Sequence, residues 1–167
     1  EARHDLDVRD RFTNVYKPLF QQYPAIRKMH RAALKTGLLA SSCSGKTSDI
    51  GSKFRSEGGH YLVATLGDEI VGGTGIRKCT SGEGVLRKGG YEIHHLFVSP
   101  EHRGRGIARA LSAMAQRLVK ATRVVVTTIS VLDEANSLYA SEGFELCEDR
   151  KIDNLTMLTY VKSYRDG

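Results

Sequence analysis

The chain has 167 residues, which is enough for one domain with a sizeable hydrophobic core. Its 40% hydrophobic and 26% charged residues are ordinary for a globular protein. No apolar run approaches the roughly 20 residues of a membrane-spanning helix, which excludes a membrane-spanning class. The net charge of +6 is concentrated in residues 1–60, which contain 11 basic and 6 acidic residues. This basic third could attract an anionic cofactor, an acidic substrate or a nucleic acid, but it lacks the interleaved aromatic residues of a nucleic-acid surface.

The cysteines and the first residues indicate the compartment. Cys43, Cys79 and Cys147 are odd in number and widely spaced, which argues against a disulfide framework and against a zinc site. We expect each to be a small buried or neutral residue. The charged N-terminal end has no apolar signal-peptide segment. These features predict a reducing, cytoplasmic setting.

The N-terminal part is predicted to be helical and then irregular. Apolar residues recur at helical spacing over residues 11–39, with an interruption at Pro24. Residues 41–59 are rich in Ser, Gly and Lys and predict a loop. Within it, Gly45-Lys46-Thr47 resembles the end of a nucleotide-binding P-loop. The glycine that a P-loop needs five residues earlier is replaced by Ala40, so we expect no nucleoside triphosphate site.

Strands and helices alternate through the rest of the chain. The turn Gly67-Asp68-Glu69 joins two β-rich segments into a hairpin. The segment 123–131, RVVVTTISV, has the composition of a buried central strand. Strands are expected over residues 60–66, 70–77, 91–98, 123–131, 144–149 and 155–162, and helices over 104–120 and 133–142. This order predicts an α/β fold with a mixed sheet.

The most informative segment runs from Tyr91 to Leu111. Its strand stops at Pro100, and a turn with two glycines then opens an amphipathic helix. A helix start built of small residues presents backbone N–H groups at the positive end of the helix dipole, which favours a phosphate or pyrophosphate. Two polar residues of the preceding strand, Glu92 and His94, lie where a reacting group would sit.

Two motifs carry a family resemblance. The turn has the pattern Phe97-Val98-x-Pro-x-x-Arg103-Gly-Arg-Gly106-Ile-Ala108. This pattern resembles the acetyl-CoA-binding motif of the GCN5-related N-acetyltransferase (GNAT) superfamily. Downstream, Ala135-x-x-Leu138-Tyr139-x-x-x-Gly143-Phe144-Glu145 is similar to the helix, turn and strand near the C-terminal end of that family's domain. With the hairpin, the resemblance covers about residues 60–150.

The resemblance implies a fold and a division of the chain. The fold is a GNAT-like mixed, largely antiparallel central sheet flanked by helices on both faces. We expect a single N-acetyltransferase domain over residues 1–167. Residues 1–59 would form its substrate side, residues 60–150 its acetyl-CoA-binding core, and residues 151–167 the final strand and tail.

The resemblance also implies acetyl-CoA as co-substrate, with no metal. Pantetheine would run beside the strand at Leu96, Phe97 and Val98, and the N–H of Leu96 would polarise the thioester carbonyl. Leu132 stands where many members have an asparagine that contacts CoA, and we expect Asn136 to substitute in part. The pyrophosphate would bind backbone N–H groups of the turn, formed by Arg103, Gly104, Arg105, Gly106, Ile107 and Ala108.

By resemblance, Tyr139 would be the general acid for the leaving thiolate, with packing against the sheet as its structural alternative. For the base the sequence leaves Glu92 and His94 open. The strand period of two predicts that Glu92, His94, Leu96 and Val98 share one face. A histidine acts as a base near neutral pH with little tuning, whereas a glutamate needs burial to raise its pKa. Each of the two could also be a satisfied interior polar residue.

The sequence therefore predicts an N-acetyltransferase that transfers acetyl directly to a primary amine, without a covalent enzyme intermediate. The amine could be a small amine, an amino-acid or peptide N-terminus, or a lysine side chain. One alternative is a non-catalytic acyl-CoA-binding regulatory module. Another is a binder of nucleic acid or an acidic partner, built on residues 1–60. Dimers are common in the resembled family, so a homodimer stays open.

Overall fold

The computed structural model describes residues 17–18, 21–22, 50–79 and 90–164. Most of the helix expected over residues 11–39, Cys43 and the connection formed by residues 80–89 lie outside this part of the chain. No helix within the described ranges is long and apolar enough to cross a membrane. In chain order the elements are α3 (Ile50–Ser56), β1 (His60–Leu66), β2 (Glu69–Lys78), β3 (Tyr91–Val98), η3 (Pro100–His102), α4 (Ile107–Val119), β4 (Arg123–Ile129), α5 (Asp133–Ser141), β5 (Glu145–Ile152) and β6 (Leu155–Ser163).

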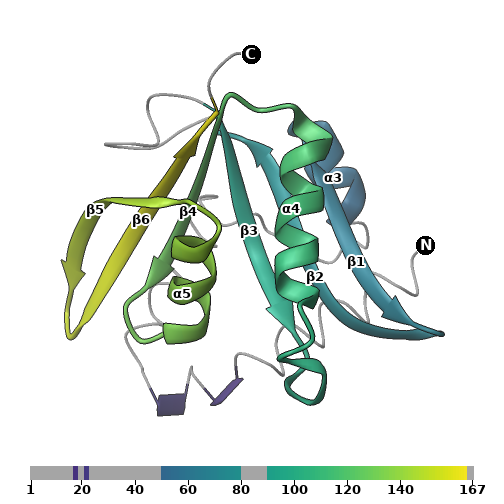
Figure 1. Cartoon of the computed structure of the whole chain (residues 1–167), viewed down its shortest axis with the longest axis horizontal. Coiled ribbons are helices and arrows are strands. Elements are labelled where there is room, and N and C mark those ends of the chain that lie inside the picture. Colours follow the sequence, from purple (N-terminus) through teal and green to yellow (C-terminus); the bar gives the residue numbers. More distant parts are fainter. Residues whose placement is uncertain (1–16, 19–20, 23–49, 80–89, 165–167) are drawn as a thin grey trace.

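The strands form one sheet in the order β1-β2-β3-β4-β6-β5, as Figure 1 shows. The pair β3–β4 is parallel and the other neighbouring pairs are antiparallel. The connection from β3 to β4 passes through α4, as a parallel crossover requires. The predicted mixed, largely antiparallel sheet is confirmed.

Helices cover both faces of the sheet, as the resemblance implied (Figure 1). A Cβ atom added to Gly75 of β2 would meet the ring of Phe54 from α3, whereas one added to Gly72 would approach Leu111 of α4. Positions 72 and 75 point to opposite faces because side chains alternate along a strand. The helices α3 and α4 therefore lie on opposite sides of the sheet.

The loop predicted over residues 41–59 is wrong for its last part, because Ile50–Ser56 form helix α3. Serine, glycine and lysine dominate the composition there, and a seven-residue helix has little stability of its own. Its one aromatic residue, Phe54, is fully buried. Packing of this ring on β2 therefore stabilises a helix that local propensity does not favour.

The main core lies between the sheet and the helices α4 and α5. Strand β4 has three consecutive buried valines, which confirms the predicted central strand. Val124 and Val126 belong to this core, whereas Val125 faces the other side of the sheet. Burying each such side chain stabilises the fold by about 1.5–3 kcal/mol. The buried members of this core cluster are Ile76, Ile93, Ala115, Val124, Val126, Tyr139, Phe144 and Tyr160.

The strands β3 and β4 are joined over a short distance. Their parallel register runs from Tyr91 opposite Val124 to Ile93 opposite Val126, and it ends there. Both strands continue, β3 to Val98 and β4 to Ile129, and Figure 1 shows them diverging toward the end where α4 begins. The backbone edges beyond Ile93 therefore lie beside the turn that precedes α4.

Candidate active site

The glycine turn leads into the N-terminus of α4. Gly104 and Gly106 have φ angles of 72° and 77°, in the left-handed region that favours glycine. Helix α4 therefore begins at Ile107, three residues later than predicted, with Gly106 as its N-cap. Among the described residues no side chain caps this helix start. A Cβ atom added to either glycine would have no described neighbour within 4 Å, so the backbone of the turn faces open space.

Arg103 connects the turn to two other elements. Its Nε donates a hydrogen bond of 3.3 Å to the carbonyl oxygen of Val98, at the end of β3. Its Nη1 lies 3.6 Å from Oε2 of Glu134, in the first turn of α5. Both side chains of this ion pair are exposed, so the pair adds little to stability. It does set a carboxylate beside a turn that is suited to anions.

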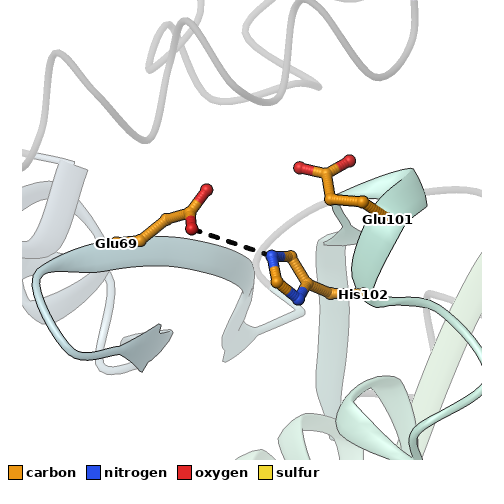
Figure 2. Close-up of side chains that lie close together, drawn as sticks. All are labelled: Glu69, Glu101 and His102. Carbon is orange, nitrogen blue, oxygen red and sulfur yellow. Dashed lines mark ion pairs between the residues drawn. The ribbon is translucent and has the colours of Figure 1, made fainter.

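A second ion pair lies just before the turn in the chain and joins η3 to β2. Figure 2 shows Glu69, Glu101 and His102 beside each other, with Nε2 of His102 3.8 Å from Oε2 of Glu69. Glu69 begins β2, and the other two residues belong to η3, directly before the turn. Their ligand-type atoms lie within 4.8 Å of one another, but both carboxylates are exposed. We interpret the group as surface charge that holds η3 to the β1–β2 hairpin.

A β-bulge interrupts β3 next to the predicted base. The register with β2 shifts between Gly73 and Gly75, and His95 has a φ of 53°. His94 lies opposite Gly75, whereas Phe97 lies opposite Gly73. Three residues of β3 therefore cover a span of two residues in β2, as a bulge requires. No glycine marks this position in the sequence.

The bulge corrects the predicted face of the strand. Glu92 and His94 do share a face, the one covered by α3, since they lie opposite Arg77 and Gly75. Val98 lies opposite Gly72, which faces α4. Leu96 packs against the core cluster, which is also on the α4 side. The prediction that Leu96 and Val98 share the face of Glu92 and His94 is wrong, because the extra residue reverses the alternation.

Glu92 and His94 form a buried pair. Oε2 of Glu92 lies 3.0 Å from Nε2 of His94, and the two side chains are 18% and 6% exposed. Burial raises the pKa of Glu92, but the charge of His94, their hydrogen bond and the charge of Arg77 outweigh burial and leave the pKa below its ordinary value. Burial here does not raise the pKa of the glutamate toward neutrality, so Glu92 is ionised at neutral pH.

The sequence did not predict Arg77, which contacts this pair, or Glu57, which forms an ion pair with Arg77. Nε of Arg77 lies 3.0 Å from Nε2 of His94, and the Arg77 guanidinium also forms an ion pair with Glu57. Arg77 lies directly opposite Glu92 in the antiparallel register. An arginine near the end of an otherwise apolar, glycine-rich strand, with an acidic residue in the next strand, is a signal that could have found it.

Apolar and thiol groups border the charged cluster. The ring of Phe54 lies 6.1 Å from that of His94 and 5.3 Å from that of Tyr61. Burial, followed by the charge of Glu92, raises the pKa of the Cys79 thiol to about 11, although Arg123 and Arg77 oppose the shift. Cys79 therefore stays protonated near neutral pH, where a thiol is a poor nucleophile.

Tyr139 lies in the core cluster. It is 4% exposed, and its ring packs against those of Phe144 and Tyr160 at centroid distances of 5.6 Å and 6.3 Å. These contacts match the structural alternative stated for this tyrosine. Its role as general acid stays a prediction.

Asn136 joins α5 to the end of β4. Its Nδ2 donates to the carbonyl oxygens of Ile129 and Ser130, at 3.1 Å and 3.4 Å. Its Oδ1 is buried and has no hydrogen-bond partner within the part of the chain that the structure describes. The Nδ2 group of Asn136 therefore links α5 to β4, whereas its Oδ1 could still accept a hydrogen bond. Contact of Asn136 with CoA stays a prediction.

A basic groove of about 490 Å³ lies along α4. Glu142, which follows α5, is its acidic member and accepts a hydrogen bond of 2.6 Å from Ser112. The candidate base and acid are not among the residues that line it. Those residues are Arg109, Ala113, Gln116, Arg117, Lys120, Ala121, Glu142, Lys162 and Tyr164.

Comparisons with known proteins place most of the described chain in one family. Residues 57–146 match the family described as Acetyltransferase (GNAT) domain. The Escherichia coli protein named Uncharacterized N-acetyltransferase YjgM is 34% identical over 94 residues, which are 54% of each chain. The Mycobacterium tuberculosis N-alpha-acetyltransferase RimI is 33% identical over 86 residues, or 52% of each chain.

Similarity to solved structures supports the fold. The yncA protein of Salmonella typhimurium, solved with its cofactor acetyl-CoA, aligns with a TM-score of 0.57 at 18% identity, over 70% of each chain. The chain spans about half the length of the curated relatives it matches. More than half of its own residues match the family description, and the chain therefore belongs to the GNAT acetyltransferase family.

Proposed function

We propose that the protein is an acetyl-CoA-dependent N-acetyltransferase that transfers acetyl directly to a primary amine. One observation carries the proposal: a single strand, β3, connects the buried Glu92–His94 pair to the open glycine turn at the N-terminus of α4. The binding of acetyl-CoA by the yncA protein supports the choice of donor. The relative named N-alpha-acetyltransferase makes peptide α-amines the first acceptors to test, before small amines and lysine side chains.

The turn fits the pyrophosphate of acetyl-CoA. Gly104 and Gly106 leave open space on the backbone, and the start of α4 has no side-chain cap among the described residues. The positive end of a helix stabilises an anion at such a position. Backbone N–H groups from Arg103 to Ala108 would hold the diphosphate, and the β3 edge beyond Ile93 would run beside pantetheine. The cofactor supplies an activated acetyl group as a thioester.

The charged cluster fits the proton transfer that the amine requires. An acceptor amine arrives as ammonium and becomes nucleophilic when it loses a proton. Glu92 is ionised and lies 3.0 Å from His94, so the pair can take up one proton and share it. The N–H of Leu96 would stabilise charge on the thioester oxygen, and Tyr139 would protonate the thiolate that leaves.

The function is tested by a thiol-release assay with acetyl-CoA against peptide α-amines, small amines and lysine peptides, together with calorimetry of CoA binding. Release of CoA that depends on one amine class supports the proposal. Binding of CoA without release for any amine class would indicate the non-catalytic module instead. Salt-sensitive binding of nucleic acid without CoA binding would indicate the binder built on residues 1–60.

Gly106→Val should weaken CoA binding at least tenfold, which corresponds to about 1.4 kcal/mol. The branched side chain fills the space in front of the turn and strains a backbone with a φ of 77°. Calorimetry measures the loss. Gly67→Val is the matched control, because Gly67 also has a positive φ of 58° and no described neighbour within 4 Å of an added Cβ, but lies in the β1–β2 turn. Equal losses in both variants would contradict the role of the turn.

Glu134→Gln should tighten CoA binding a few-fold at low salt. The substitution removes the carboxylate that lies 3.6 Å from Arg103, leaving that guanidinium available to an anion. Because the ion pair is exposed, the gain should fade as ionic strength rises. Dissociation constants at two salt concentrations measure it, with the exposed Glu145→Gln on β5 as the control. A gain of the same size in both variants would indicate net charge alone.

A further inference from the structure

The Nε2 atom of His94 has two polar neighbours, one of which donates hydrogen bonds and the other of which accepts them. Nε of Arg77 lies 3.0 Å away and can act only as a donor. Oε2 of Glu92 also lies 3.0 Å away and, when ionised, acts only as an acceptor. A ring nitrogen accepts a hydrogen bond without a proton and donates one with a proton, so the two bonds belong to two different proton states of His94.

The position of Arg77 is fixed by the segment that follows α3. Its side chain is 11% exposed and forms an ion pair with Glu57. The nearby Gly59 lies so close to β2 that a Cβ atom there would stand 2.0 Å from the carbonyl oxygen of Ile76 and 2.6 Å from the Cα of Arg77. This close approach brings Glu57 to the guanidinium and holds Arg77 against the ring of His94.

We propose that Arg77 is a positioning residue that keeps His94 ready to accept a proton, an inference that rests on the proposed acetyltransferase function. In the resting state, Nε–H of Arg77 donates to Nε2, and the ring carries its single proton on Nδ1. When the substrate ammonium releases a proton, Nε2 takes it up. The hydrogen bond from Arg77 breaks as the proton arrives, because Nε2 has a single lone pair, and Nε2–H then donates to Glu92. The proton is later released to solvent, which restores the resting state.

The charges around His94 determine in which direction each substitution should move the protonation of the ring. Glu92 lies on the same strand, Arg77 belongs to β2, and Cys79 directly follows the end of that strand. Glu57 lies behind Arg77, and the ring of His95 is 6.0 Å away. The fixed positive charge of Arg77 disfavours a protonated ring, whereas the negative charges of Glu92 and Glu57 favour it. Arg123 from β4 acts on the neighbouring Cys79 in the same direction as Arg77.

The test follows the titration of His94 without relying on turnover. Long-range 1H–15N spectra of the histidine rings, recorded from about pH 5 to 9, report the proton state and tautomer of each ring. The spectrum of His94→Gln assigns the His94 signals among the six histidines. In the unaltered protein we expect the neutral ring to carry its proton on Nδ1. A neutral ring protonated on Nε2 would overturn the proposal.

Arg77→Gln should raise the titration midpoint of His94, because a nearby positive charge is lost. Arg77→Lys keeps the charge and should restore most of the midpoint, but not the Nδ1–H tautomer. Glu57→Gln removes a negative charge and should move the midpoint the other way. The control is Arg150→Gln, an exposed arginine on β5 at the far edge of the sheet.

If Arg77→Gln does not fold, two other variants still decide the proposal. Arg77→Lys tests the tautomer of the His94 ring, and Glu57→Gln tests the direction in which its titration midpoint moves. No shift in these variants, or an equal shift in Arg150→Gln, would overturn it. In the enzyme, the acidic limb of kcat/KM should move with the midpoint, which a merely structural role would not cause. A shifted midpoint in a protein that releases no CoA with any amine would support the coupling and overturn the proposed function.

Discussion

His94→Gln should lower kcat for amine acetylation by about 10²- to 10⁴-fold, the usual contribution of a general base. It should also remove the acidic limb of the pH–rate profile near neutrality. The pKa of Glu92 lies below its ordinary value of 4.5, so this carboxylate stays ionised near neutral pH. Protonation of Glu92 therefore cannot cause a rate that falls as the pH drops from about 8 to about 5. A limb between about pH 5 and 8 falls in the range where histidine titrates. Rate profiles of kcat/KM from pH 5 to 9 measure both effects.

Glu92→Gln is the matched comparison, because it keeps the shape of the side chain and removes its charge. It should retain an acidic limb, moved to lower pH, since a protonated His94 loses the carboxylate 3.0 Å away. Its kcat should fall as well, since the protonated ring loses its partner. If Glu92→Gln abolishes the limb and His94→Gln keeps it, Glu92 is the base.

Gly75→Val should destabilise the fold by about 3–5 kcal/mol, as much as removing the Phe54 ring. The new Cβ would stand 2.2 Å and 2.3 Å from two atoms of that ring, which is fully buried and cannot retreat without opening the packing of α3 on β2. Since domains are stable by about 5–15 kcal/mol, little stability would remain. Urea unfolding measures the change.

A double-mutant cycle tests the cause. Gly75→Ala and Phe54→Ala should each destabilise, but the two together should cost about 0.5–3 kcal/mol less than their sum, because removing the ring also removes the clash. Gly67→Ala provides the control, since it strains a turn without meeting a described neighbour within 4 Å. Strict additivity would show that Gly75 is needed for a reason other than Phe54.

Local signals predicted the strands and the turn. Proline ends β3, glycines with positive φ mark the turn, and consecutive valines mark the central strand β4, and each of these signals acts within a few residues. The start of α4 was placed three residues early, because glycine pairs precede many helices without belonging to them. Sequence patterns thus located the glycine turn, and they placed the start of α4 to within three residues.

The charged cluster depends on contacts that the sequence does not display. Glu57 and Arg77 are twenty residues apart in the chain and meet because α3 folds back on β2. Predicting their contact requires α3, which packs on β2 through the buried ring of Phe54. The bulge at His95 contains no glycine that would mark it in the sequence. Regular alternation of side chains therefore assigned Leu96 and Val98 to the wrong face of the sheet. Tertiary packing, rather than local preference, decides both features.

The short junction of β3 and β4 has a consequence for solubility. Three paired positions join the strands, so the middle of the sheet contains two inner edges beyond Ile93 and Val126. An exposed strand edge is a template for pairing with an extended segment of another chain. Most sheets confine this hazard to their outermost strands, whereas here it lies at the centre of the sheet. If acetyl-CoA binds along these edges as we propose, it would also protect the protein from self-association.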